Sequence, residues 1–399
     1  MIDRIKQLAK DNFNWTKEIR NSIHSNPELS FQEFETSNYI ISKLKEIEFE
    51  FETGFVKTGI VATLKCKNPS KKTIALRADM DALPIQETNE VSYKSKNRGI
   101  MHACGHDVHS ASLLGVAKIL SELKNAIEGT IKFIFQPGEE KLPGGASLMI
   151  QEGLLQKHTT NVMLAQHVTP QIETGKVGFK SGMFMASTDE IYIEVIGKGG
   201  HAAMPATYNN PLFIASELLL KLREEFTPEN LFEIGIDTPT VLAFGKITGD
   251  GETNVVPDKV NIEGTFRTFD EVWRKTAHSK IKTICNEIAT KNNAKINCNI
   301  LLGYPFLVND ENTTTHAKKA AQEYLGPENI IDLDYRMTAE DFAFFSQQIP
   351  SCFYRIGTGN VEKNITSNVH TSNFDIDEKS IEIMIGLMSY IAIEELKMS

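Results

Sequence analysis

The chain has 399 residues, of which 41% are hydrophobic and 24% charged, and its formal net charge is −10. This length exceeds what one hydrophobic core usually serves, so two domains are expected. The negative charge argues against a nucleic-acid partner, because neutralising phosphates requires a basic surface.

The sequence contains neither a membrane-spanning apolar run nor a signal-peptide pattern in its first ten residues. Its 5 cysteines are odd in number and scattered, which fits reduced thiols better than a disulfide framework. We therefore expect a soluble, cytoplasmic protein with no membrane partner.

The first half of the chain predicts alternating helices and strands. Apolar residues recur at helical spacing over residues 2–44, interrupted by a turn around Pro27. A second helix is expected over residues 108–123. Short apolar runs predict strands at residues 59–64, 73–76, 130–135 and 161–165. This alternation favours a mainly parallel sheet in an α/β domain.

Chemically active side chains follow three of these strands. Asp79 and Asp81 come after the strand at 73–76, Glu139 and Glu140 after the strand at 130–135, and His167 after the strand at 161–165. Open α/β sheets bind ligands at the carboxyl ends of their strands. These residues therefore predict one pocket at that edge of the sheet.

The pattern changes near Ser187. The predicted order becomes strand, helix, strand, strand, helix, strand, at residues 191–196, 210–225, 240–247, 260–269, 270–292 and 295–302. This is the split βαβ order of a ferredoxin-like α+β domain. Beyond it the first pattern resumes, with elements at 341–348, 352–357 and 376–395. We expect a discontinuous catalytic domain, 1–186 and 304–399, and an inserted domain, 187–303.

Residues 101–109, Met-His-Ala-Cys-Gly-His-Asp-Val-His, hold the densest group of possible ligands. Cys104 and His106 combine a thiolate with an imidazole, which suits zinc and other first-row divalent ions. His102 is expected to donate to a ligand or to hold a loop, and His109 to open the helix that follows. Asp107 is expected to cap the helix that follows.

The predicted pocket contains enough donors for two divalent ions once His370, from a late loop, is added. One carboxylate is then left over. Adjacent glutamates on an extended segment rarely point the same way, so Glu139 and Glu140 are expected to have different roles. One binds metal and the other moves a proton.

Five ordered motifs resemble the M20 metallopeptidases, and within them the amidohydrolase branch that includes hippurate hydrolases, auxin-conjugate hydrolases and N-acetyldiaminopimelate deacetylases. The resemblance spans the chain from His24 to Glu378. The motifs are Arg-Ala-Asp-Met-Asp-Ala-Leu-Pro at 77–84, Met-His-Ala-Cys-Gly-His-Asp at 101–107, Phe-Gln-Pro-Gly-Glu-Glu at 135–140, Gly-Lys-Gly-Gly-His-Ala-Ala-Met-Pro at 197–205 and Ala-Glu-Asp-Phe-Ala at 339–343.

The resemblance implies two divalent metal ions per subunit, zinc or manganese first and cobalt or nickel as alternatives. Glu139 is implied as general base, and Asp79 as a residue that orients the site. Whether Asp81 shares that task stays open. The implied metal ligands are Cys104, His106, Glu140, His167 and His370.

The resemblance also assigns roles to the inserted domain, as a lid and as a dimerisation element. His201 is implied to reach the partner subunit's active site and stabilise the oxyanion. Asn254 and Arg267 lie where relatives contact the substrate carboxylate, which a guanidinium binds well. The sequence departs from its relatives at Asn26 and Gly138, where His and Ala are common.

The expected function is metal-dependent hydrolysis of a small N-acyl amino acid by a homodimer, with a metal-activated water and Glu139 as base. One alternative is a dipeptidase or aminopeptidase of the same clan. An alternative of another class is a metal-binding dimeric scaffold without catalysis. The acyl group, the amino acid and the native metal are left open.

Overall fold

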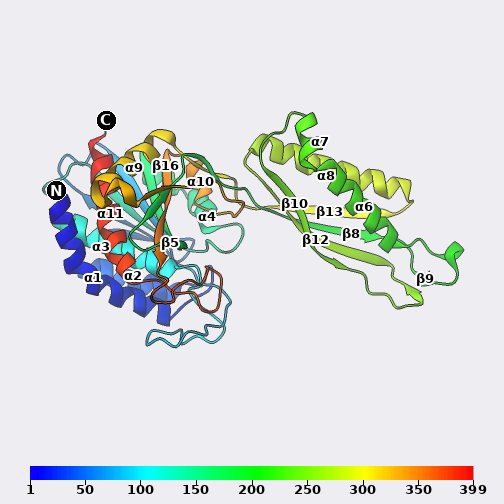
Figure 1. Cartoon of the computed structure of the whole chain (residues 1–399), viewed down its shortest axis with the longest axis horizontal. Coiled ribbons are helices and arrows are strands. Elements are labelled where there is room, and N and C mark those ends of the chain that lie inside the picture. Colours follow the sequence, from blue (N-terminus) through cyan, green and yellow to red (C-terminus); the bar gives the residue numbers. More distant parts are fainter. Residues whose placement is uncertain (399) are drawn as a thin grey trace. The chain divides into compact units, whose positions relative to one another are not determined.

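The computed structural model describes residues 1–398 and divides the chain into two compact units (Figure 1). The first unit comprises Met1–Phe184, Val308–Tyr335 and the chain from Glu340 onward. The second comprises Met185–Leu307 and Arg336–Ala339, so the segment 187–303 falls within it. In the described chain no helix has the length and apolar character needed to cross a membrane.

The first unit is built on a sheet of eight strands among the described residues, in the order β1-β2-β4-β3-β5-β16-β6-β15. Neighbours from β4 through β3 and β5 to β16 run parallel, while β1 and β2 form an antiparallel edge. This mixed α/β sheet, mostly parallel, confirms the predicted fold class. The strands are β1 (Glu50–Phe55), β2 (Gly59–Lys65), β3 (Thr73–Asp79), β4 (Thr130–Gln136), β5 (Val162–Glu173), β6 (Val177–Phe179), β15 (Ile330–Asp332) and β16 (Ser351–Gly359).

Helices α1, α3, α9 and α11 pack together beside this sheet (Figure 1). Nearly every side chain of α3 is buried, because it lies among β3, α1 and α11 rather than at the surface. α4 and α10 contact each other and the strands β4 and β16. The helices are α1 (Ile2–Ser25), α2 (Phe34–Glu46), α3 (His106–Leu123), α4 (Gly145–Gln151), α5 (Leu154–Lys157), α9 (Glu311–Leu325), α10 (Ala343–Ser346) and α11 (Lys379–Lys397).

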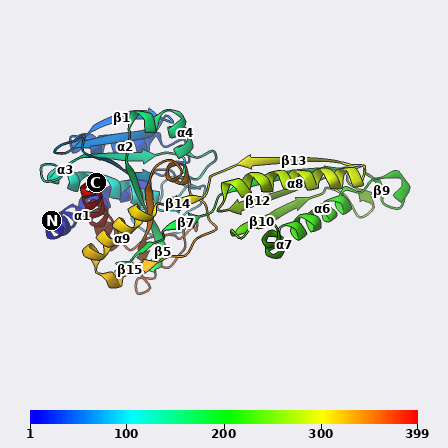
Figure 2. The same cartoon turned by 90° about the horizontal axis from the view of Figure 1, so that it is seen from above.

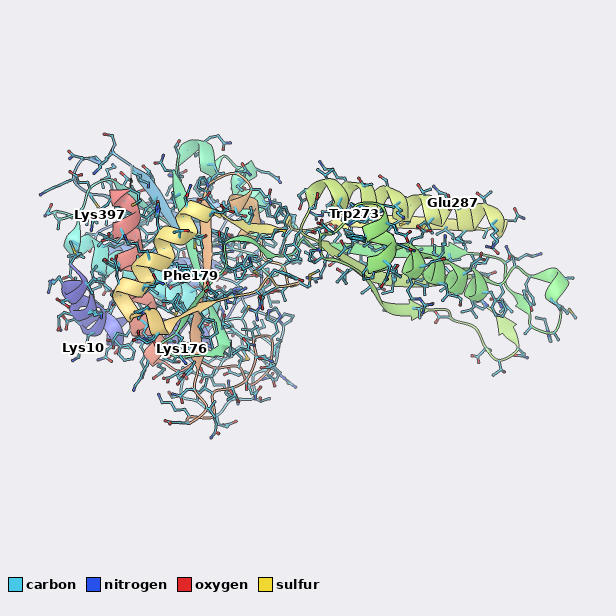
Figure 3. The ribbon with its side chains drawn as sticks, turned by 45° about the horizontal axis from the view of Figure 1, so that its top comes forward. Lys10, Lys176, Phe179, Trp273, Glu287 and Lys397 are labelled. Atoms are coloured by element: carbon cyan, nitrogen blue, oxygen red, sulfur yellow. The ribbon has the colours of Figure 1, made fainter. Side chains whose placement is uncertain are left out.

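The second unit has a four-stranded antiparallel sheet in the order β10-β12-β8-β13. The helices α6 and α8 pack against each other and on this sheet (Figure 2), in the predicted split βαβ order. Trp273 of α8 (Figure 3) is buried and donates to the Thr240 hydroxyl at 3.0 Å. The elements are β8 (Asp189–Ile196), α6 (Pro211–Glu225), β10 (Thr240–Thr248), β12 (Lys259–Thr268), α8 (Glu271–Lys291) and β13 (Lys295–Leu302).

The remaining helices and strands are short. β9 and β11 form a two-stranded ribbon, and β7 pairs with β14. Their bounds are β7 (Gly182–Met185), β9 (Gly200–His201), η1 (Pro205–Thr207), α7 (Pro228–Glu233), β11 (Val255–Val256), β14 (Leu307–Asn309) and η2 (Pro327–Asn329).

A buried ionic network joins α1 to the start of α3. Arg20 is fully buried, and its Nε donates to Asp107 Oδ2 at 2.7 Å while Nη2 donates to Asp375 Oδ1 at 3.0 Å. His24 Nδ1 lies 2.7 Å from the same Asp107 oxygen. The predicted capping role of Asp107 is therefore wrong. Gly105 precedes α3, and none of the described side chains caps the helix there. The Asp107 carboxylate instead contacts Arg20 and His24 of α1.

Replacing Arg20 by Met should lower the free energy of unfolding of the first unit by about 3–5 kcal/mol, because two carboxylates lose a buried partner. The molecule has one Trp in each unit, so urea unfolding in a Trp273→Phe background is followed by the fluorescence of Trp15. The matched control is Lys65→Met, which breaks an exposed pair with Glu50 and should cost under about 1 kcal/mol. Equal losses in both variants would contradict the argument.

Candidate active site

Neighbouring strands carry the candidate side chains to one buried region of the first unit. β3 ends at Asp79, β4 ends just ahead of Glu139, and β5 lies on the other side of β3. β5 continues to Glu173, so His167 projects from inside the strand, whereas a strand ending before it was predicted. The continued pairing of β5 with β16 explains the difference, because His167 is opposite Arg355 in that ladder.

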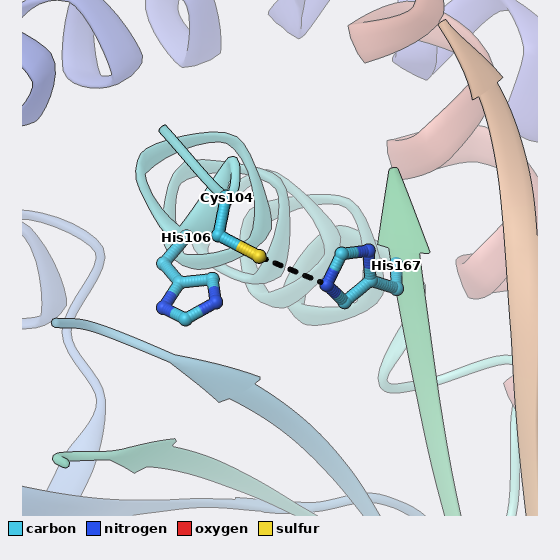
Figure 4. Close-up of side chains that lie close together, drawn as sticks. All are labelled: Cys104, His106 and His167. Carbon is cyan, nitrogen blue, oxygen red and sulfur yellow. Dashed lines mark hydrogen bonds between the residues drawn. The ribbon is translucent and has the colours of Figure 1, made fainter. Parts of the chain in front are cut away.

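The five predicted metal ligands converge in two donor clusters that share Cys104. One contains Cys104, His106 and His167 (Figure 4), and the other contains Cys104, Glu140 and His370; within each cluster the ligand atoms lie within 4.8 Å of one another. The Cys104 Sγ lies 3.6 Å from His167 Nε2 and 3.3 Å from His370 Nε2. Cys104 is therefore the residue that the two clusters have in common.

Gly105 makes the close spacing of Cys104 and His106 possible. Its φ is +84°, in the left-handed region that side chains disfavour. A Cβ at this position would also lie 2.5 Å from the Val168 side chain. The chain can therefore turn sharply between the two ligands only because residue 105 is glycine.

The histidines of the first cluster are oriented by their Nδ1 atoms. His106 Nδ1 lies 3.2 Å from Asp81 Oδ1, and His167 Nδ1 lies 2.7 Å from the Val168 carbonyl oxygen. Both oxygens accept a hydrogen bond, so each ring carries its proton on Nδ1. Nε2 is then left with a free electron pair, which is the arrangement that outer carboxylates and carbonyls impose on metal-binding histidines.

The donor set fits divalent metal ions. His106 Nε2 is buried and has no hydrogen-bond partner among the described residues, although it belongs to a donor cluster. Such an orphaned atom is costly unless a ligand or ion satisfies it. Glu140 Oε1 lies 3.1 Å from His370 Nε2, another predicted ligand. Burial raises the pKa of the Cys104 thiol, and a bound cation would favour its thiolate. Thiolate, imidazole and carboxylate together match first-row divalent ions.

Asp79 and Asp81 hold different parts of this region. Asp79 accepts from Arg77 Nη1 and from His109 Nδ1, each at 2.7 Å. Besides contacting His106, Asp81 accepts from the Ser30 hydroxyl at 2.6 Å. It also accepts from the backbone N–H groups of residues 139 and 140, at 3.1 and 3.0 Å. Asp81 thus fixes a candidate ligand and the turn that carries both glutamates.

Replacing Asp81 by Asn should weaken metal affinity by about 10- to 100-fold, because an amide NH₂ would face groups that donate to the carboxylate. Competition with a chromophoric chelator measures the change. The control is Asp377→Asn, a buried aspartate that instead accepts from Asn360 and Lys363. Unchanged metal affinity in the Asp81 variant would show that the ligands need no support from it.

Glu139 lies beside the donor clusters in an acidic, buried setting. Burial raises the pKa of its carboxyl well above the usual range, and the nearby Glu340 and Glu140 raise it further. The backbone N–H of Asp341 donates to Glu139 Oε1 at 3.4 Å. A carboxylate with a raised pKa is a stronger proton acceptor than an exposed one, which suits a general base.

The structure places several further residues next to the candidate site. His109 was expected only to open the helix α3, but its ring donates to Asp79 and accepts from the Val168 N–H at 3.0 Å. Arg77, Glu340 and Asp341 stood within the quoted motifs, which was the available signal. His102 is buried, and its nitrogens have no hydrogen-bond partner among residues 1–398.

The other three predicted residues belong to the second unit. His201 is exposed on β9, and its Nδ1 accepts from the Ala203 N–H at 3.1 Å. Asn254 is exposed beside β11, and its carbonyl accepts from the Ala202 N–H at 2.9 Å. Arg267, half-buried on β12, donates to the Met337 carbonyl at 2.9 Å.

The chain is similar to known proteins over most of its length. A model of "Peptidase family M20/M25/M40" matches residues 75–394. The chain is 33% identical to thermostable carboxypeptidase 2 of Saccharolobus solfataricus, over 96% of each protein. It is 38% identical to N-acetyl-L-cysteine deacetylase of Bacillus subtilis, over 91% of this chain and 84% of that protein. Identity to hippurate hydrolase of Campylobacter jejuni is 35%, over 96% of each.

A solved structure supports membership of the same family. The chain is similar, with a TM-score of 0.83 and 30% identity, to a Bacillus subtilis protein described as a dinuclear metal-binding peptidase of the M20 family. The alignment covers 98% of this chain and 99% of that one. Fold and site together define a metal-binding hydrolase of amide bonds. The chain belongs to peptidase family M20/M25/M40, and its named relatives confirm the amidohydrolase branch.

Proposed function

We propose that this protein hydrolyses the amide bond of small N-acyl amino acids. The observation that carries the proposal is the position of Glu139, a buried carboxylate beside two donor clusters that share Cys104. The relatives named N-acetyl-L-cysteine deacetylase and hippurate hydrolase support the substrate class, because both names describe removal of an acyl group from an amino acid.

Five side chains would hold two divalent ions in this proposal. When bound, these ions supply Lewis acidity toward the amide carbonyl and lower the pKa of the attacking water. Zinc and manganese are the first choices, with cobalt and nickel as alternatives, because the donors are of mixed type. The ligands are Cys104, His106, Glu140, His167 and His370.

Glu139 then carries the proton through the reaction. Its carboxylate accepts a proton from the attacking water and delivers it to the nitrogen of the departing amine. Asp79 acts less directly, since it holds His109 and Arg77 beside the ligands. Asp81 holds the turn that presents the base.

His201 is proposed to stabilise the oxyanion that forms at the amide carbonyl. Because its Nδ1 accepts from a backbone N–H, the neutral ring carries its proton on Nε2, which can donate to an oxyanion. Asn254 and Arg267 are proposed to bind the substrate carboxylate, a partner suited to the guanidinium group.

A homodimer formed through the second unit is part of the proposal, with His201 acting in the partner subunit's site. Two features of the unit support it. The α6 helix exposes Phe213 and Leu220, with 75% and 55% of their surface accessible. Within residues 1–398 the edge strand β10 pairs only with β12, which leaves its other side open to a second copy.

A double variant, Phe213→Glu with Leu220→Glu, should be monomeric in light scattering, because two charges would be buried at the interface. Its activity should fall together with the dimer fraction if His201 acts across the interface. Val361→Glu, at an exposed position of the first unit, is the control that should stay dimeric. A monomeric wild-type protein, or a fully active monomeric variant, would reject the dimer proposal.

The decisive experiment is a substrate panel. N-acetyl amino acids, hippurate and dipeptides are offered to apo-protein reconstituted separately with zinc, manganese, cobalt and nickel. The proposal requires the N-acyl amino acids to have the highest kcat/KM. Preference for dipeptides would favour the second candidate, a peptidase, which the similarity to thermostable carboxypeptidase 2 supports. Binding of metal without hydrolysis of any substrate would favour a scaffold.

A further inference from the structure

The carboxylates of Glu340 and Asp341, which follow the segment Arg336–Ala339, lie directly beside Glu139. Glu340, Asp341 and Glu139 are all buried, and their ligand atoms lie within 4.8 Å of one another. The Asp341 N–H also donates to Glu139 Oε1, at 3.4 Å. Three acids this close repel one another, so the surroundings must hold them in place.

The side chain of Asp341 is anchored from three elements. Arg77 Nη2, at the end of β3, donates to its Oδ1 at 2.7 Å. Gln136 Nε2, at the end of β4, donates to Oδ1 at 2.9 Å and to Oδ2 at 2.7 Å. The N–H of Ala146, in the first turn of α4, donates to Oδ2 at 2.9 Å. These bonds fix the carboxylate and, through it, the backbone N–H that contacts Glu139.

Arg77 links the same acids to the ligand region. Its Nη1 donates to Asp79 at 2.7 Å, and its Nη2 lies 3.0 Å from Glu340 Oε1. Its Nε donates to the Gln136 side chain at 2.8 Å. The guanidinium is only 2% exposed, so its planar fork holds several acceptors in one geometry with little competition from water.

We propose that Asp341, held by Arg77 and Gln136, is a positioning residue for Glu139. Its backbone N–H holds the Glu139 carboxylate near the segment 340–341, so that Glu140 serves as the metal ligand and Glu139 moves the proton. The inference rests on the proposed function, in which Glu139 is the base. It explains how two adjacent glutamates come to have different tasks.

The test is a double-mutant cycle with Asp341→Asn and Glu139→Gln. Asn has nearly the same size, but its NH₂ would face donors that now bind the carboxylate. In an otherwise wild-type enzyme this variant should lower kcat by about 10- to 100-fold, as expected for a displaced catalytic group. KM should change by less than about threefold, because substrate binding is untouched, and metal content should stay the same.

In the Glu139→Gln background, Asp341→Asn should lower kcat by less than about twofold, because the group that it positions has already been removed. An equal fold-loss in both backgrounds would overturn the inference and leave the proposed function standing. Loss of metal, or a rise in KM alone, would overturn it too. Near-wild-type turnover of the single Glu139→Gln variant would reject the base itself and the inference with it.

Asp189→Asn is the matched control. Asp189 is a buried aspartate of the second unit that accepts from Arg274 Nε at 2.9 Å. Its replacement should lower the melting temperature and leave kcat unchanged. If it reduced kcat as much as Asp341→Asn does, the loss would reflect general destabilisation, and the positioning role would be rejected.

Discussion

In the Glu139→Gln variant, kcat for N-acyl amino acid hydrolysis is expected to fall by about 100- to 10,000-fold. Glutamine keeps the shape of the side chain but cannot accept the proton of the attacking water. KM and metal content should stay close to wild type, because neither donor cluster that contains Cys104 includes Glu139. The loss therefore measures proton transfer.

Initial rates of amine release, measured against substrate concentration, give kcat and KM, and elemental analysis gives bound metal per chain. Glu173→Gln, an exposed change at the end of β5, is the control and should match the wild type. Turnover near the wild-type level in the Glu139 variant would contradict the proposed mechanism. Loss of metal in that variant would instead assign Glu139 to the ligands.

Replacing Cys104 by Ser should have an equally large effect, through metal binding. Cys104 is the residue common to both donor clusters, so its loss weakens both positions at once. A serine hydroxyl is a much poorer ligand for first-row divalent ions than a thiolate. We expect fewer than one metal ion to remain per chain after dialysis, and kcat to fall at least as far as in the Glu139 variant.

Metal analysis after dialysis and thermal unfolding measure this effect. A chelator should lower the melting temperature of the wild type, because bound metal stabilises the folded state, and should hardly change that of Cys104→Ser. Cys352→Ser, at a buried position of β16, is the control and should keep its metal. Full metal content in the Cys104 variant would reject the shared-ligand assignment.

Much of the fold could be predicted because it depends on local patterns. Continuous apolar runs indicated β3 and β4, and helical spacing of apolar residues indicated α1. The strand-end rule then placed Asp79 and Glu139 near each other, since parallel neighbours end at the same edge of a sheet. The order of strands and helices in the second unit could also be predicted, because strand-like and helix-like patterns of apolar residues follow one another along the sequence.

Other features could not be predicted, because distant residues decide them. The length of β5 depends on its pairing with β16, so His167 lies inside the strand. The exposed strand β1 has little apolar pattern and exists through pairing with β2. Asp107 looked like a helix cap in the local sequence, but Arg20, far away in the chain, takes its carboxylate.

The sequence by itself determined the family, the α/β class and the kinds of donor atoms, because these follow from motif order, periodicity and side-chain chemistry. Only the tertiary structure decided how the candidate metal-binding atoms are oriented. The proton positions of His106 and His167 depend on Asp81 and on the Val168 carbonyl. The surroundings of Glu139 depend on Asp341, which reaches it from the last part of the chain. Such orientations arise from contacts between distant segments, which no local pattern encodes.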